Sequence, residues 1–121
     1  LESIPGFQTE ISLDQFKNLI KKNNISIIAQ TKDICPADKK IYALRDVTST
    51  VESIPLICAS IMSKKLAEGA ASLVLDVKYG NGAFMTTAAR AVDLAKKLKG
   101  IGVGAKRKVT AFITDMNQPL G

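Results

Sequence analysis

The pattern of apolar and polar positions divides the chain into helical and extended stretches. A helix is expected from residue 12 to about residue 22, because Ser12 and Gln15 form a capping box and apolar residues then recur at helical spacing. Apolar runs rich in β-branched residues at 24–30, 72–80 and 108–116 are typical of buried strands. These runs predict three strands.

Further helices are expected between these strands. One has Pro36 at its first position, and a long, mostly apolar one runs from about 51 to 67 and ends at Gly69. Another opens with Thr86 or Thr87 as its cap, and the glycines at 100, 102 and 104 are expected to end it.

The resulting βαβαβ order predicts an α/β fold: a parallel sheet with right-handed crossovers and helices on its faces. The 72–80 run is apolar at positions of both parities, as in strands covered on both sides. Ligands of such sheets bind at the carboxyl ends of the strands, which here correspond to loops 31–36, 79–85 and 115–121.

Composition excludes several classes of function. Hydrophobic residues make up 46% of the chain and charged residues 23%, and no apolar run is long enough to span a membrane. The net charge of +6 comes from scattered lysine pairs, and aromatic residues are only 5%, so nucleic-acid binding is not favoured. The absence of histidine excludes a histidine base within this chain and disfavours zinc, and two distant cysteines fit the reduced thiols of a cytoplasmic protein.

The 51–67 helix has one polar and one apolar face. Cys58, Met62 and Leu66 form the apolar face, which we expect to pack on the sheet. The other face points into solvent or into a polar cleft, and its members are Ile57, Ser60, Ile61 and Lys64. In a cleft, the hydroxyl and ammonium would meet carbonyl oxygens of a planar ligand while Ile57 packs on its ring. Arg45 beside Asp46 is equally compatible with a surface ion pair.

Two loops permit more than one interpretation. KYGNGAF is similar to a phosphate-cradling glycine loop, but a plain strand-to-helix turn is the better prediction, with Phe84 in the core. Asp76 and Asp115 near the ends of two strands could form a carboxylate pair, although loop hydrogen bonds explain such residues more often.

Three strings carry a closer resemblance: PADKKIYALRDVTSTVESIPLICASIMSKKLAEGA, VLDVKYGNGAFM and TDMNQPLG. Together they resemble the pyrimidine-nucleoside phosphorylase and thymidine phosphorylase family over nearly the whole chain, starting at LESIPGF. The resemblance implies that residues 1–121 are part of the central α/β domain, with an N-terminal helical domain and a C-terminal domain outside the chain. It also implies a pentosyltransferase of pyrimidine salvage, which converts a nucleoside and phosphate into a pyrimidine base and ribose- or deoxyribose-1-phosphate.

The same resemblance assigns site residues. Arg45, Ser60 and Lys64 match the family's base-holding residues, and the two cations among them match its catalytic charges. Fixed cations of this kind stabilise the charge that develops on the departing base. The residues that pack around the base match Tyr42, Ile57 and Phe84.

Other implications of the resemblance concern cofactors and partners. Phosphate is the co-substrate and no organic cofactor is expected, while a potassium ion could be bound partly by the backbone carbonyl of Leu120. Phosphate-binding and dimer contacts lie outside the chain, so we expect a homodimeric parent and an inactive isolated chain, with no nucleic-acid or membrane partner. Cys35 stands where relatives usually have a capping threonine.

Three other functions remain open from the sequence. The least favoured is nucleic-acid binding, which predicts an affinity for DNA or RNA that falls steeply with salt. An anthranilate-type phosphoribosyltransferase would need a diphosphate-binding glycine loop and acidic magnesium ligands, which these strings do not match. A non-catalytic base-binding or scaffold module is the remaining alternative.

Overall fold

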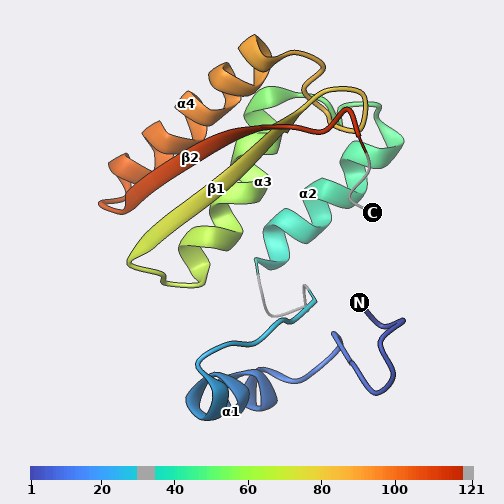
Figure 1. The fold of residues 1–121 in the computed structure, drawn as a ribbon, viewed down its shortest axis with the longest axis vertical. Helices are drawn as coiled ribbons and strands as arrows, with labels where there is room; N and C mark the ends of the chain where they lie inside the picture. The colour runs from blue at the N-terminus through green and yellow to red at the C-terminus, as the bar shows by residue number, and fades with distance from the viewer. Residues whose placement is uncertain (30–34, 119–121) are drawn as a thin grey trace. The chain divides into compact units, whose positions relative to one another are not determined.

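A computed structural model describes residues 1–29 and 35–118, which belong to two compact units, Leu1–Ile34 and Cys35–Gly121. The described residues form four helices and two strands in the order α1, α2, α3, β1, α4, β2 (Figure 1). None of the described helices combines the length and the apolar character that crossing a membrane requires.

The first unit contains α1, Leu13–Asn23. The predicted capping box is confirmed: Gln15 N donates to Ser12 Oγ at 3.2 Å, and Ser12 N donates to Gln15 Oε1 at 2.9 Å. Asn24 ends the helix in the left-handed region at φ 60°.

The strand predicted at 24–30 is wrong for the residues that the structure describes, since 25–29 have no regular structure. An extended segment becomes a strand only when a neighbour pairs with its backbone. Here Ala29 N donates to Thr9 O at 2.9 Å, and residues 1–29 contain no strand. Ile25 accordingly remains 72% exposed.

The second unit is built on a parallel pair of strands, β1 (Ser72–Tyr79) and β2 (Lys108–Asp115), with Ser72 opposite Lys108. Helix α4, Ala88–Gly104, connects them and packs on both. The predicted α/β class with a parallel sheet is therefore confirmed, with two strands among the described residues in place of three.

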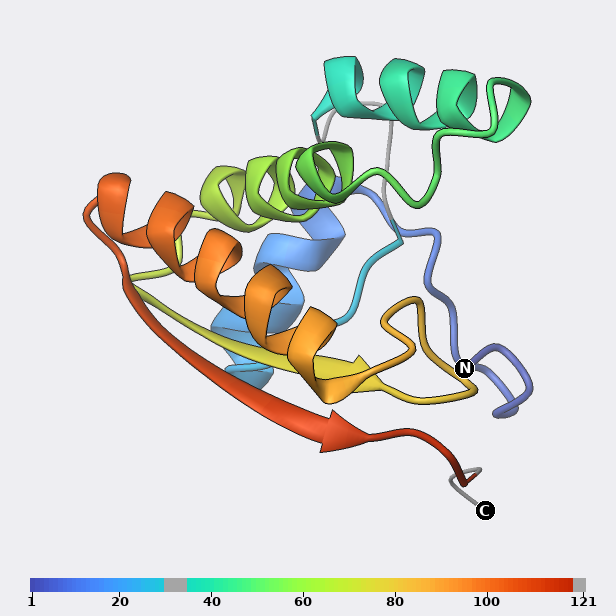
Figure 2. The same cartoon turned by 90° about the horizontal axis from the view of Figure 1, so that it is seen from above.

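The core of this unit lies on one face of the sheet. Leu73, Leu75 and Val77 alternate along β1 as buried residues, and α3 (Ile54–Ala67) and α4 lie on the same side of the strands (Figure 2). On the opposite face Val74 is 71% exposed, and Phe112 is exposed as well. Within the described residues of this unit, the expectation of a sheet covered on both faces is wrong.

Of the three glycines expected to end α4, Gly104 is its last residue as predicted, whereas Gly100 and Gly102 lie inside the helix. A Cβ on Gly102 would collide with Cγ2 of Val109 and would lie 3.4 Å from Cε of Met62. The missing side chain thus lets α4 approach β2 closely. It also lets Met62 of α3 approach α4. Cys58 and Met62 belong to one buried cluster with Leu73 and Leu75 of β1, so the apolar face of α3 faces the sheet as expected and contacts α4 as well.

Helices α2 and α3 each have a proline in the first turn, a position where its missing N–H costs no helical hydrogen bond. Helix α2, Pro36–Val47, has Pro36 in its first turn as predicted. Helix α3 begins at Ile54 instead of about 51, with Ser53 as its N-cap and Pro55 in its first turn. Cys58 and Met62 are buried in the core cluster.

Candidate substrate-binding site

The polar face of α3 lies against α2. Lys64 Nζ donates to Asp38 Oδ2 at 2.6 Å and to Ser60 Oγ at 2.8 Å. Asp38 and Ser60 are both buried, and the Lys64 side chain is only 26% exposed. The interpretation of Lys64 as a solvated lysine is therefore wrong: its ammonium is anchored between two helices.

Arg45 is 3% exposed and binds backbone carbonyls. Its Nε donates to Thr50 O at 3.4 Å, its Nη1 donates to Leu56 O at 3.3 Å, and its Nη2 donates to Val51 O. These carbonyls belong to the connection between α2 and α3 and to the first turn of α3. The alternative of a surface ion pair with Asp46 is wrong, because the guanidinium is buried in this connection.

Tyr42 brings the two cations to one aromatic ring. Its ring centroid lies 5.2 Å from Arg45 Cζ and 6.0 Å from Lys64 Nζ, the range in which a cation is attracted to the ring face. The residue is 42% exposed, so part of the ring remains accessible. We call Asp38, Tyr42, Arg45, Ser60 and Lys64 the cation cluster.

Sequence reasoning missed Asp38. A signal for it was present, because Asp38, Tyr42 and Arg45 are spaced i, i+4 and i+7 and so share one face of α2. A carboxylate on the helical face that carries Arg45 is a natural partner for Lys64 on the next helix, and the structure shows this ion pair.

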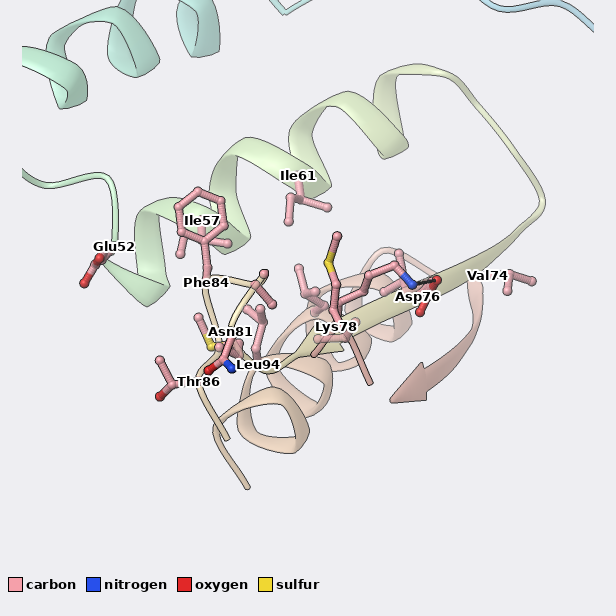
Figure 3. A pocket seen from close by; sticks show the side chains of 17 residues that line it. Glu52, Ile57, Ile61, Val74, Asp76, Lys78, Asn81, Phe84, Thr86 and Leu94 are labelled. Atoms are coloured by element: carbon pink, nitrogen blue, oxygen red, sulfur yellow. Dashed lines mark hydrogen bonds and ion pairs between the residues drawn. The ribbon is translucent and has the colours of Figure 1, made fainter. Parts of the chain in front are cut away.

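A cavity of about 680 Å³ lies between α3, β1 and the loop that follows β1 (Figure 3). Ile57 and Ile61 line it from α3 and Phe84 from the loop, while Glu52, Lys78 and Asn81 supply polar groups. Its volume suits a small organic molecule. Phe84 is 65% exposed and is not a core residue, so that prediction is wrong.

The six predicted base-site residues fall into two neighbouring groups. Tyr42, Arg45, Ser60 and Lys64 belong to the cation cluster, and Ile57 and Phe84 line the cavity. Helix α3 contributes to both groups, with Ile57 one turn before Ser60 and Ile61.

The glycine loop after β1 is bonded to the segment after β2. Gly82 N donates to Met116 O at 3.1 Å, and Asn81 N donates to Asn117 Oδ1 at 3.0 Å. Two amides that a phosphate cradle would use are therefore engaged within the chain. The cap of α4 is Thr87, whose side chain accepts from Arg90 N, so the interpretation as a strand-to-helix turn is confirmed.

Asp76 and Asp115 do not form a carboxylate pair. Asp76 accepts hydrogen bonds from Lys78 Nζ at 2.8 Å and from Thr114 Oγ1, which together lower the pKa of the Asp76 carboxyl. Asp115 accepts from Asn117 N at 2.8 Å. Loop and cross-strand hydrogen bonds account for both residues.

Two further predictions concern Cys35 as the start of α2 and Leu120 as a metal ligand. Cys35 caps α2 in the left-handed region at φ 48° without a side-chain bond, yet the helix still begins at Pro36. Leu120, the predicted potassium ligand, lies outside the described residues. In residues 1–29 and 35–118 no three His, Cys, Asp or Glu side chains gather in a way that could hold a metal.

Comparison with known proteins decides the family. Residues 1–121 match the family described as "Glycosyl transferase family, a/b domain". The chain belongs to this family. It is 57% identical over 121 residues to the pyrimidine-nucleoside phosphorylase of Geobacillus stearothermophilus, covering 100% of the chain and 28% of that relative.

Two further relatives agree. The pyrimidine-nucleoside phosphorylase of Bacillus subtilis (strain 168) is 54% identical over 121 residues, 100% of the chain and 28% of the relative. The thymidine phosphorylase of Rhizobium meliloti (strain 1021) is 54% identical over 120 residues, 99% of the chain and 27% of the relative. The chain thus spans less than a third of the length of these relatives.

In this glycosyl transferase a/b domain, the cation cluster places two positive charges beside a partly exposed aromatic ring. Its cations are fixed by hydrogen bonds, which avoids reorganisation when a ligand acquires charge. A partly exposed aromatic ring and the neighbouring apolar cavity supply surfaces for a flat ring.

Proposed function

We propose that the full-length protein to which this chain belongs catalyses phosphorolysis of pyrimidine nucleosides, and that residues 35–118 supply the base subsite. The observation that supports this most is the Lys64 ammonium, held by Asp38 and Ser60 on the helix that also lines the cavity. It occurs in a chain that is 57% identical to a pyrimidine-nucleoside phosphorylase.

The chemistry gives the cations a role. A phosphate oxygen attacks C1′ of the sugar, the C1′–N1 bond breaks, and its electron pair leaves with the base. The negative charge spreads onto the base carbonyl oxygens, where Lys64 and Arg45 stabilise it more than they stabilise the neutral nucleoside. Arg45 retains donors for this purpose, because a guanidinium has more N–H groups than its three carbonyl bonds use.

The test is phosphate-dependent release of base from uridine and thymidine by the full-length protein. Lys64→Ala is expected to lower kcat/KM by about 10²–10³-fold, the loss typical of one charge-stabilising donor. Lys65→Ala is the matched control, because the Lys65 side chain is 43% exposed and pairs with Glu68, the residue that caps the same helix. A folded wild-type protein that releases no base from either nucleoside refutes the proposal.

Base binding provides a test that does not depend on turnover. Uracil or thymine should bind to the full-length protein in calorimetry, and binding should weaken in Lys64→Ala but not in Lys65→Ala. Equal binding by both variants would remove Lys64 from the subsite.

Other parts of the proposal concern the whole protein. We expect phosphate to be held by residues outside this chain, a cytoplasmic homodimer acting in pyrimidine salvage, and no phosphorolysis by the 121-residue chain alone. Activity with 5-phosphoribosyl diphosphate in place of phosphate would instead favour the phosphoribosyltransferase alternative.

A further inference from the structure

We propose that Asp38 is a positioning residue: it holds the Lys64 ammonium at the face of α3 where its charge can reach the departing base. This inference rests on the proposed function and extends it to a residue on another helix. Asp38 itself acts through Lys64 and is not assigned a contact with substrate.

The geometry of the ion pair carries the argument. The Lys64 Nζ to Asp38 Oδ2 distance is 2.6 Å, and the two side chains are 26% and 9% exposed. An ammonium has three N–H donors. Two are used by Asp38 and by Ser60 Oγ, at 2.6 and 2.8 Å, which fixes the direction of the remaining donor.

A lysine without such an anchor would not hold this position. Its long stem has many rotamers, and ordering them costs free energy each time a ligand binds. Asp38 approaches from α2 while Lys64 extends from α3, so the pair sets the ammonium position through the packing of two helices. The order is therefore present before the ligand arrives.

The positive charge of Arg45 is a second reason for the carboxylate of Asp38 beside Lys64. Arg45 and Lys64 lie 5.2 and 6.0 Å from the same Tyr42 ring, so their like charges repel across a partly buried region. The carboxylate of Asp38 offsets that repulsion next to Lys64, whose hydrogen-bond acceptors among the described residues are the side chains of Asp38 and Ser60. Asp38 thereby allows two positive charges to serve one subsite.

The experiment compares Asp38→Asn with Asp46→Asn in the full-length protein. Asn has nearly the same shape as Asp but carries no charge, and Asp46 is an exposed carboxylate on the same helix. Asp38→Asn is expected to lower kcat by about 10–100-fold, as losses of orienting groups commonly do, with a smaller change in KM. Asp46→Asn should match wild type.

A double-mutant cycle separates positioning from a general structural role. If Asp38 acts through Lys64, adding Asp38→Asn to Lys64→Ala lowers kcat no further. A purely structural role would lower the activity of both backgrounds by the same factor. Thermal unfolding of each variant identifies any that fail to fold, and the cycle is then completed with Asp38→Ser.

The leaving base gives a second, chemical readout. A 5-fluorinated uracil leaves more readily because fluorine withdraws electrons, so it needs less stabilisation from Lys64. The loss caused by Asp38→Asn should be smaller for 5-fluoro-2′-deoxyuridine than for 2′-deoxyuridine. Equal losses for both substrates, or multiplicative losses in the cycle, would overturn the positioning role while leaving the proposed function intact. A folded wild type without phosphorolysis would overturn both.

Discussion

Replacing Arg45 should loosen the connection between α2 and α3 before it affects the rest of the domain. Its guanidinium donates to the carbonyls of Thr50, Val51 and Leu56, and the residue is 3% exposed. Arg45→Ala removes all three donors at once. Arg45→Lys keeps the charge and most of the stem, but a single ammonium cannot span three carbonyls.

The magnitude follows from those bonds. A hydrogen bond from a charged donor contributes about 1.5–3 kcal/mol net. Two of the three, at 3.3 and 3.4 Å, are long, and carbonyls near the surface can regain water. We therefore expect a loss of about 3 kcal/mol for Arg45→Ala and about 2 kcal/mol for Arg45→Lys. Lys40→Ala, at an exposed position of the same helix, should stay within about 0.5 kcal/mol.

Amide hydrogen exchange measures this locally. Ser53 N donates to Thr50 O at 3.2 Å and Ile57 N donates to Ser53 O at 2.8 Å, so both amides report on the connection. In Arg45→Ala they should exchange about a hundredfold faster, which corresponds to the expected 3 kcal/mol. Amides of β1 should change much less. Unchanged exchange at Ser53 and Ile57, or equal acceleration in β1, would refute the reasoning.

Three further predictions concern other parts of the domain. Gly80→Ala should lower the free energy of unfolding by about 1–3 kcal/mol, because φ is +119° and a Cβ would lie 2.6 Å from Asn117 Oδ1. Urea unfolding measures this loss. The control is Gly100→Ala, which should be neutral or stabilising because a Cβ there meets open space. Asp76→Asn should be less stable than wild type at pH 7. Because hydrogen bonds lower the folded-state pKa of Asp76, that difference should vanish as the pH falls below about 4, and a pH-independent difference would contradict this. Burial raises the pKa of the Cys58 thiol, so mass spectrometry after alkylation at pH 8 should find Cys35 modified first and Cys58 only upon unfolding; equal rates would exclude this.

Local patterns predicted the elements whose causes are local. The capping box at Ser12, the proline start of α2 and the Thr87 cap of α4 all depend on residues within one turn. Gly104 ends α4 as predicted, but Gly102 lies inside the helix, where its missing side chain makes room for Val109 of β2. Local sequence could not indicate that contact. The run at 24–30 misled the prediction for the related reason that a strand requires a partner.

The site follows the same division. The family resemblance named six residues, but residue identity alone left Arg45 and Lys64 compatible with a solvated surface. Only the packing of α2 on α3 decides that Arg45 is buried on carbonyls and that Lys64 is paired with Asp38.

By itself, the sequence determined which segments form helices, that the two strands at 72–79 and 108–115 are parallel, and which family the chain resembles. The tertiary structure alone decided which face of the sheet is covered, where the cavity lies, and what each buried charge contacts. The physical reason is that caps and periodicity act over a few residues. Burial and ion pairing depend instead on which surfaces distant segments bring together.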